Sequence, residues 1–443
     1  MKNNSYVIFM ICFFLMFFKL ISASQEISLA DIYKLTFEKD SFQSISKSTI
    51  DIEKNKIMQT VGLYKPQLKL EHLTSKRGGD YEFEPVVRYG NFEVPVDINI
   101  FRTYETKLVL NQLLYDHNRI KYARKIGETE IYVRTWELKK YFYEELRQNI
   151  FLYFGIISSV NKIKLLEESL VLLQKAVSIG EVQLNNGLIT EVDLRLIINR
   201  KNEQVLMISE ENKNLENLKT ILAKRLHISN IDLTGPGIGV VPLQDLSFYL
   251  GHLNDNCEYN IQELRVSQSK DFSERIKADR GPYLSFYTQY GLRSDELLST
   301  ESGWIIGLTL SQDIFNGSIK KKKQEEALSQ IRLQEDLLKE IREKNEMLLR
   351  EQFRRASETY SRLSIIEERV NIYRDKVEID RQRLEQGNIS EIEFLRTVTE
   401  FNSQQIEYEL RKIDYIKNYY ELVFLCGLAE EFIRGGDFEK DNN

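Results

Sequence analysis

Two copies of one long unit follow each other in this amino-acid sequence. The segment LVLNQLLYD at 108–116 matches LTLSQDIFN at 308–316, and LNNGLITEVD at 184–193 matches LEQGNISEIE at 384–393. Both matches have the same offset of 200 residues, which two unrelated coincidences would not share. The chain is therefore predicted to be a tandem duplication, with a first repeat over 25–235 and a second over 236–428.

Between the matched segments, apolar residues recur at alternating spacings of three and four, which is typical of a coiled-coil seam. From Tyr115 to Gly187 is 72 residues, and a helix of that length spans roughly 108 Å. Long helices are predicted over 116–186 and 316–386, with return helices over 191–226 and 391–427. The seam residues are Ile163, Leu166, Leu170, Leu173, Val177 and Leu184, with counterparts Leu363, Ile366, Val370, Tyr373, Val377 and Leu384.

The segments 187–190 and 387–390 are predicted to be the tips of two helical hairpins. A glycine fits the left-handed position that ends a helix. A hydroxyl residue three positions later fits the N-cap of the next helix, and an acidic residue at N3 completes a capping box. These roles fall on Gly187, Thr190 and Asp193 in the first turn, and on Gly387, Ser390 and Glu393 in the second.

Four segments before the long helices alternate apolar with polar residues over about ten positions, at 64–74, 103–113, 282–292 and 303–313. Such alternation is typical of a transmembrane β-strand, although a half-buried strand of a soluble protein has the same pattern. Four strands cannot close a barrel, since the smallest in a bilayer need about eight. The chain is therefore expected to oligomerise, with two copies giving eight strands and three giving twelve.

The remaining segments complete the expected organisation. Each repeat is predicted to begin with a helix before its strands, placed at 242–279 in the second repeat. The last 15 residues, 429–443, are predicted to be a polar tail. The fold class is therefore mainly α, with a small membrane β part.

The N-terminus carries a lysine, an apolar run over 6–18 and the small residues Ala23 and Ser24. This pattern is typical of a cleaved secretory signal, predicted over 1–24. A membrane anchor is the alternative, but the run is short for a span and Lys19 interrupts it.

Composition excludes several classes of function. A net charge of −6 gives no basic excess for nucleic acid. The four histidines are scattered, and the sequence has neither a nucleotide-binding loop nor a nucleophile motif. We therefore predict no enzyme, no catalytic residues and no cofactor or metal site. Cys257 and Cys426 are too far apart for a disulfide framework and are expected to be ordinary helix residues.

The chain resembles the TolC-like outer-membrane efflux protein family. The resemblance covers about 28–427 and rests on SLADIYKLTFEKD, LYKPQLKLE, the two strand-to-helix segments and the two turns NNGLITEVD and QGNISEIEFL. It implies a homotrimer with one twelve-stranded barrel in the outer membrane and an α-helical tunnel across the periplasm. It also implies a periplasmic adaptor protein and an inner-membrane pump or ABC transporter as partners, in efflux or type I secretion. Family members export many kinds of cargo, so the resemblance does not specify what passes through.

The resemblance also implies roles for the hairpin tips. Adaptor docking at the tunnel entrance falls on Gly187, Leu188, Thr190, Gly387 and Ser390. A gate would fall on Asp193 and Glu393, with Arg396 in place of the basic residue that the family often has where this chain has Ile389. The alternative is that the two acidic residues only cap helices and that Arg396 lies on a solvated face.

Two further features have competing interpretations. Tyr290 and Trp304 are candidates for an aromatic belt at the lipid headgroups, or else for ordinary packing at the equator of the tube. The run Lys320–Lys323 either meets lipid phosphates or forms a solvated first helical turn. At the level of the whole chain, the alternatives to a channel are a periplasmic adaptor, which would have a single hairpin, and a structural coiled-coil protein, which would leave the strands unexplained.

Overall fold

The computed structural model describes residues 27–76, 86–89, 92–95, 102–228, 239–294 and 301–435, so the predicted signal at 1–24 lies outside the described residues. The chain divides into two compact units. The first, which we call the helical unit, comprises Met1–Ser46, Trp136–Asn260 and Lys339–Asn443. The second, the sheet unit, comprises Lys47–Thr135 and Ile261–Leu338. Each unit draws on both sequence repeats, so the compact units are not the repeats themselves.

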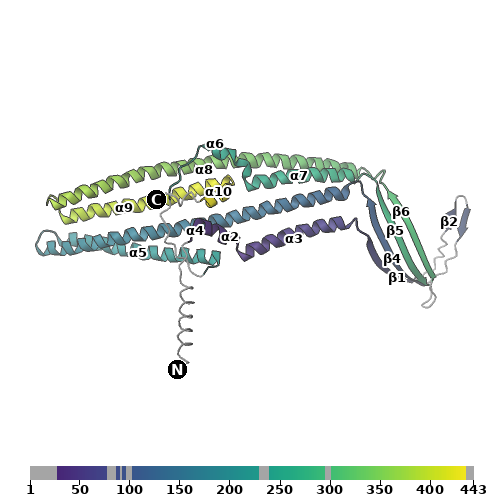
Figure 1. Ribbon diagram of the computed structural model, residues 1–443, viewed down its shortest axis with the longest axis horizontal. Coiled ribbons are helices and arrows are strands. Elements are labelled where there is room, and N and C mark those ends of the chain that lie inside the picture. The colour runs from purple at the N-terminus through teal and green to yellow at the C-terminus, as the bar shows by residue number, and fades with distance from the viewer. Residues whose placement is uncertain are drawn as a thin grey trace, which may run out of the picture. The chain divides into compact units, whose positions relative to one another are not determined.

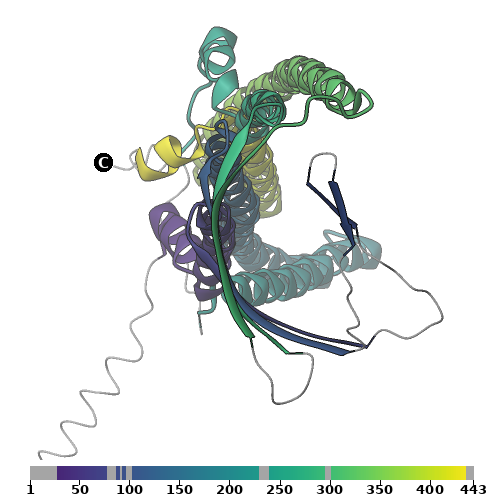
Figure 2. The same cartoon turned by 90° about the vertical axis from the view of Figure 1, so that its right-hand side faces the viewer.

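The sheet unit contains one curved four-stranded antiparallel sheet (Figures 1 and 2). The strand order is β1-β4-β5-β6, so the two hairpins of the duplication lie next to each other. Their registers are equivalent, because Leu68 pairs with Leu110 in the first and Leu284 pairs with Leu310 in the second. The strands are β1 (Gln67–Lys76), β4 (Arg102–Tyr115), β5 (Tyr283–Ser294) and β6 (Glu301–Ser311), and a separate small hairpin pairs β2 (Val86–Tyr89) with β3 (Phe92–Pro95).

Helical segments of α3 (Asp40–Gly62), α4 (Arg119–Asn185), α7 (Cys257–Ala278) and α8 (Ile319–Glu385) complete the sheet unit. Charged side chains join neighbouring helices there. Lys125 on α4 contacts the buried Asp271 on α7 at 2.7 Å. Arg265 of α7 likewise contacts Glu130 of α4 at 2.6 Å. Both contacts therefore link α4 to α7 through charged side chains.

The long helix α4 begins at Arg119, three residues later than the predicted 116. The cause is Asp116, which is buried and accepts hydrogen bonds from the backbone N–H groups of Asn118 and Ile120 at 3.1 and 2.6 Å. His117 and Asn118 also have positive φ angles of 53° and 69°, which no α-helix accommodates. In the second repeat, Gly317 and Ser318 have positive φ, and α8 begins at Ile319.

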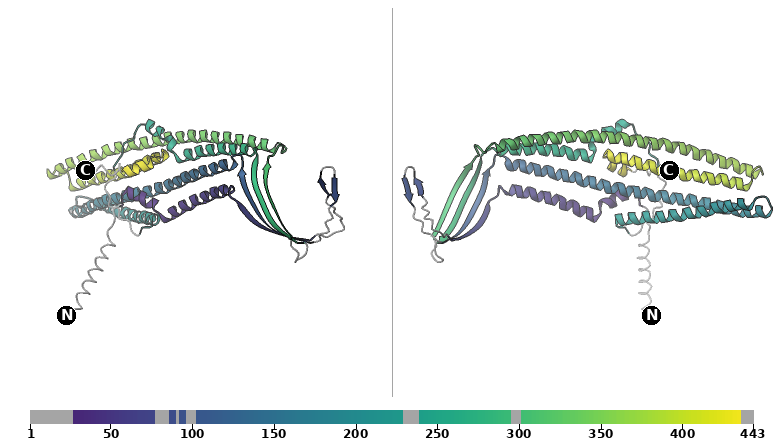
Figure 3. Two further views of the ribbon diagram at one scale, coloured as in Figure 1. Left: turned by 45° about the vertical axis from the view of Figure 1, so that its right-hand side comes forward. Right: turned by 180° about the vertical axis from the view of Figure 1, so that it is seen from behind.

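In the helical unit, α4 turns back into α5 (Glu191–Leu226), and α8 turns back into α9 (Glu391–Leu425), as Figure 3 shows. The predicted seam residues of α4 and α8 are all buried or half-buried, as an apolar seam that faces other helices requires. Each long helix has 67 residues, or roughly 100 Å of helical rise. Helix α9 ends at Leu425, two residues before the predicted end.

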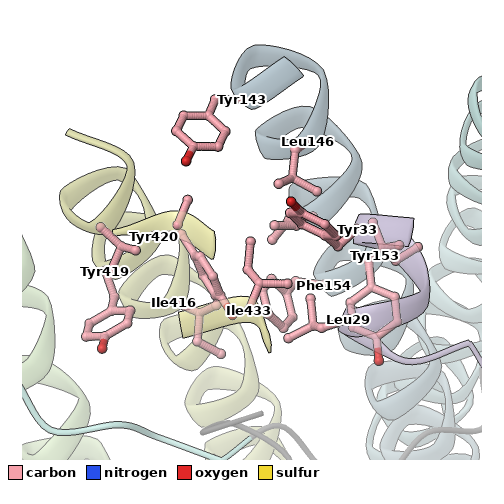
Figure 4. Packing of buried hydrophobic residues seen from close by; sticks show 14 of the residues in the cluster. Leu29, Tyr33, Tyr143, Leu146, Tyr153, Phe154, Ile416, Tyr419, Tyr420 and Ile433 are labelled. Carbon is pink, nitrogen blue, oxygen red and sulfur yellow. The ribbon is translucent and has the colours of Figure 1, made fainter. Parts of the chain in front are cut away.

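The main apolar core of the helical unit brings together the first and the last of the described helices (Figure 4). Leu29 and Tyr33 come from α2 (Leu29–Phe37), and Ile433 comes from α10 (Ala429–Gly435). The Tyr33 hydroxyl donates to the Glu430 carboxylate at 2.7 Å. The prediction of a polar tail from 429 is therefore wrong over Ala429–Gly435, because Ala429 and Ile433 bury apolar surface. Residues 436–443 lie outside the described part of the chain.

The single helix predicted over 242–279 is also wrong. The structure has α6 (Leu246–Gly251), a 3₁₀ turn (Leu253–Asp255) and then α7. The break is caused by Asn256, whose side chain accepts from the backbone N–H of Glu258 at 2.8 Å and donates to the Leu425 carbonyl at 3.0 Å. An asparagine so engaged starts a new helix and does not continue an old one. None of the described helices is long and apolar enough to cross a membrane.

Candidate functional site: hairpin tips and an exposed apolar sheet face

Both hairpin tips have the same backbone geometry. Gly187 and Gly387 have φ angles of 68° and 73°, values that disfavour any residue with a Cβ atom. The N–H of Gly187 donates to the Leu184 carbonyl at 2.9 Å, and the N–H of Leu188 donates to Gln183 at 2.8 Å. The second turn repeats both bonds with the same lengths. These paired bonds satisfy the last carbonyls of each long helix and fix the direction of the turn.

The predicted capping boxes are present after both glycines. At the first tip, the N–H of Asp193 donates to the Thr190 hydroxyl at 3.2 Å, and the N–H of Thr190 donates to the Asp193 carboxylate at 3.0 Å. Bonds from the side chain and backbone of Thr190 lower the pKa of Asp193. Ser390 and Glu393 form the same two bonds at the second tip, at 3.2 and 3.0 Å.

The candidate gate residues Asp193, Glu393 and Arg396 are all exposed in the single chain. The Arg396 guanidinium lies 3.5 Å from the carboxylate of Glu400, one turn further along α9, and both side chains are exposed. Glu393 contacts Ser390 in the described structure. Leu188, a predicted docking residue, lies between Gly187 and the N-cap residue Thr190 in the first turn, and it is 70% exposed. Within one chain, therefore, Asp193 and Glu393 cap helices, and the side chain of Leu188 is exposed.

Sequence reasoning missed a difference between the two hairpins. In α8 the carboxylate of Asp380 is buried, accepts a hydrogen bond from the Thr397 hydroxyl at 2.8 Å and lies 3.5 Å from Arg383. At the corresponding place in the first hairpin, a Cβ atom on Gly180 would lie 3.5 Å from Ile197. The offset of 200 residues, applied to every position and not only to the apolar ones, would have found this exchange of an apolar contact for a polar one.

A groove of about 840 Å³ lies between α4, α5 and α9 in the helical unit. Its most buried charge is Glu211, which accepts from the Lys162 ammonium at 2.6 Å and from the Ser159 hydroxyl at 2.7 Å. Desolvation raises the pKa of Glu211, but these bonds and one from Asn214 outweigh it, so the pKa lies below its ordinary value. The groove is therefore lined by both apolar and polar side chains, and its buried acid is hydrogen-bonded within the chain.

The four-stranded sheet has two different faces. Alternate residues of paired strands lie on the same side of a sheet, so the register assigns each side chain to a face. One face, which we call the apolar face, is uncovered by any described helix and is largely exposed. It carries Leu68, Leu70, Leu108, Leu110, Phe286, Tyr290, Leu292, Trp304, Ile306, Leu308 and Leu310.

The opposite face is mostly polar. Lys69 and Lys107 both contact the carboxylate of Glu71, at 2.7 and 3.5 Å. A sheet with water on both sides gains nothing from an apolar face of this extent, and exposed apolar patches of this kind mark contact with lipid or with another protein. The arrangement therefore suits a sheet with hydrocarbon on one side and water on the other.

The two belt candidates face each other. Tyr290 of β5 pairs with Trp304 of β6 on the apolar face. They are 51% and 72% exposed, so neither is buried by packing within the chain. Lys320 contacts Asp313 at 2.9 Å and Lys322 contacts Glu325 at 2.7 Å. Two lysines of the 320–323 run are thus engaged within the chain.

Each hairpin leaves one strand at an edge of the sheet. Among the described strands, β1 pairs only with β4, and β6 pairs only with β5. Strand edges expose unpaired N–H and C=O groups and favour pairing with another strand. The fold thus defines a duplicated helical-hairpin protein with an open sheet that is apolar on one face.

Several solved structures of membrane proteins are similar to this chain. The chain matches CusC with a TM-score of 0.70 and 13% identity, covering 92% of this chain and 95% of that one. It matches VceC of Vibrio cholerae at 0.70 and 12% identity, covering 90% and 96%. It matches the CmeC outer membrane channel of Campylobacter jejuni at 0.66 and 12% identity, covering 94% and 90%. No protein-family model and no curated protein matches the chain.

The chain therefore has the fold of the TolC-like outer-membrane channels. The similarity extends over at least nine-tenths of each of these structures. The expectation of a mainly α protein with a small sheet is confirmed.

Proposed function

We propose that this protein is an outer-membrane exit duct, a passive conduit for efflux or type I secretion. The observation that carries the proposal is the apolar face of the four-stranded sheet, which is exposed in the single chain and bounded by two strand edges. A bilayer accepts such a sheet only when all backbone groups are paired, which requires closure into a barrel. Three copies supply twelve strands, and we infer a homotrimer.

The long helices extend the conduit into the periplasm. In the closed trimer the polar face of the sheet lines a water-filled lumen, and Lys69, Glu71 and Lys107 provide its charges. Helices of 67 residues continue that lumen as a tunnel of roughly 100 Å. The chain contains no nucleotide-binding motif, so the energy for transport comes from an inner-membrane pump or transporter.

The hairpin tips are the proposed entrance and the docking surface for a periplasmic adaptor. Gly187 and Gly387 create rigid turns, Thr190 and Ser390 fix the following helices, and Leu188 offers an exposed apolar contact. Asp193, Glu393 and Arg396 are the proposed gate. Tyr290 and Trp304 are the proposed belt at the lipid headgroups, where aromatic rings with polar atoms are favoured.

Two measurements on the expressed protein test this function. Outer-membrane fractionation followed by gel electrophoresis with and without heating should give a membrane-bound oligomer that heat converts to the single chain. The purified oligomer should also form conducting pores in planar bilayers. A soluble periplasmic monomer would contradict the proposal and would favour a structural coiled-coil protein.

A further inference from the structure

The duplication relates the two edge strands of the sheet to the two central ones. Residues of β6 stand 200 positions after their counterparts in β4. Residues of β1 stand 216 positions before their counterparts in β5, as Pro66 and Pro282 illustrate. The same pair of offsets converts the Leu68–Leu110 pair of the first hairpin into the Leu284–Leu310 pair of the second. Equivalent strands of the two repeats are therefore paired in an equivalent register.

Among the strand pairings of the described four-stranded sheet, the pairing of β4 with β5 joins the two repeats. Its register places Asn111 opposite Tyr287 and Leu110 opposite Thr288. Applying the two offsets converts these pairs into Ser311 with Glu71 and Leu310 with His72. Those residues lie at the two opposite edges of the sheet, so they meet only between two molecules.

We propose that β6 pairs antiparallel with β1 of a second copy of this chain in the register that β4 and β5 show within the chain. Ser311 then faces Glu71 of the second copy, and Leu310 faces His72. The proposal rests on the proposed function, because it defines the seam that closes the barrel. The register joins even-numbered residues to even-numbered ones, so the side of the sheet that carries the apolar face stays the same across the seam. Leu308 would then face Thr74 of the second copy.

Exposed side chains next to the helices support this register. Below the irregularity at Leu113, Tyr115 pairs with Leu284. The corresponding intermolecular pair is Phe315 with Leu68 of the second copy. Phe315 is 84% exposed and Leu68 is 64% exposed in the single chain. The seam would therefore cover two large apolar side chains with each other.

A second correspondence exchanges an ion pair for an apolar pair. Within the chain, the Arg119 guanidinium lies 3.8 Å from the Asp279 carboxylate. Their counterparts are Ile319 and Leu63 of the second copy, both exposed in the single chain. Both members of the pair change from charged to apolar together, as expected for residues in direct contact.

A third correspondence moves a glycine from one side of the contact to the other. A Cβ atom on Gly281 would collide with the ring of His117. The counterpart of Gly281 is Lys65 of the second copy, which has a long side chain. The counterpart of His117 is Gly317, where an added Cβ atom would meet open space within the chain. Gly281 leaves room for His117 inside the chain, and Gly317 leaves room for Lys65 at the seam.

Cysteine pairs in the full-length protein test the register directly. Facing residues of antiparallel strands have Cα atoms about 4.5–5.5 Å apart, within disulfide range. The matched variant carries Ser311→Cys and Glu71→Cys. Two controls combine Ser311→Cys with Lys69→Cys or with Leu73→Cys, which shifts one partner by about 7 Å along its strand. The unmodified chain, with buried Cys257 and Cys426, controls for native thiols.

Under mild oxidation the matched variant should give covalent oligomers with at least about fivefold the yield of either shifted variant. A higher yield from a shifted pair, or no cross-linking of any pair in an oligomer that still forms on gels, would overturn the register and leave the exit duct intact. Absence of any oligomer in the unmodified chain would reject the exit duct as well.

A charge exchange tests the same seam without cysteines. Ile319→Arg or Leu63→Asp alone should lower the temperature at which the oligomer dissociates. The double variant recreates the Arg119–Asp279 pair at the seam and should recover most of the loss. Equal losses in the single variants that simply add in the double variant would show that the two residues are not in contact and would overturn the proposal.

Discussion

The hydroxyl of Thr397 on α9 donates a 2.8 Å hydrogen bond to the buried carboxylate of Asp380 on α8. The pair lies near the second tip, where the first hairpin has Ile197 and Gly180 instead. A buried carboxylate is unfavourable unless its oxygens are hydrogen-bonded. The hydrogen bond from Thr397 therefore offsets the cost of burying the Asp380 carboxylate between α8 and α9.

Removing only the donor should weaken the second hairpin. Thr397→Val leaves the Asp380 carboxylate without its buried donor and should destabilise the protein by about 1–3 kcal/mol. Adding Asp380→Ala replaces both partners by apolar groups and should recover most of that loss. Thermal unfolding of both variants is the measurement. If the double variant is less stable than Thr397→Val, the buried carboxylate is not what makes the single variant unstable.

The second tip should depend on its cap. Ser390→Ala removes the acceptor for the N–H of Glu393 and should cost about 1 kcal/mol. The loss should be local, with faster hydrogen exchange in the first turn of α9. Ser361→Ala is a matched control, because the Ser361 hydroxyl bonds only within α8 at an exposed position. Equal losses of stability in the two variants would show that the Ser390 cap does not stabilise the second tip.

Acid should loosen the first tip. The pKa of Asp193 is lowered by its bonds with Thr190, so the cap contributes fully above the pKa of an unfolded aspartate, near 4. That contribution is lost as the pH falls through the lower pKa of the folded state. Hydrogen exchange of the first turn of α5 should therefore accelerate below about pH 4, after correction for the intrinsic rate. Asp193→Asn should lack this pH-dependent step.

Conductance measurements in planar bilayers distinguish a gating role of Glu393 from a capping role. Glu393→Gln keeps an acceptor at N3 for the capping box but removes the charge that a trimer would repeat three times around the entrance. If the carboxylates attract cations, the variant should show weaker cation selectivity and weaker block by multivalent cations in planar bilayers. Unchanged selectivity and block would leave Glu393 with the capping role alone.

The two described thiols should be unreactive in the folded protein. Burial raises the pKa of Cys257 to about 11 and that of Cys426 to about 12, and only the thiolate reacts rapidly. A maleimide reagent at pH 7 should label neither residue until denaturant is added, when both should react. Labelling of Cys426 in the native state would show that the end of α9 opens.

Sequence reasoning predicted the repeated features well because repetition made them visible. The capping boxes at Thr190 and Ser390 follow from local residue order, and both are present. The apolar seam of the long helices follows from spacing alone. The resemblance to a family of channels supplied the expected fold, and solved structures confirm that fold.

The predictions that the structure contradicts concern segments whose conformation depends on contacts with residues far away in the sequence. The helix break at Asn256 requires the carbonyl of Leu425, and the helical C-terminal segment requires a core to cover Ile433. Residues 116–118, which were predicted to begin the long helix, lie outside α4 because of the bonds that Asp116 makes. Asp116 also accepts a hydrogen bond from the Tyr64 hydroxyl, 52 residues away. No local pattern encodes such contacts, since the same residues elsewhere would continue a helix or remain in solvent.

The equivalence of the two hairpin registers bears on how the proposed assembly forms. Six similar units around a ring would require six molecules to meet if each chain carried one unit. Because each chain carries two units already joined by β4 and β5, only three molecules have to meet. The duplication therefore reduces the number of molecules that must meet during assembly. Half of the contacts between units form within one molecule, at a rate that does not depend on protein concentration.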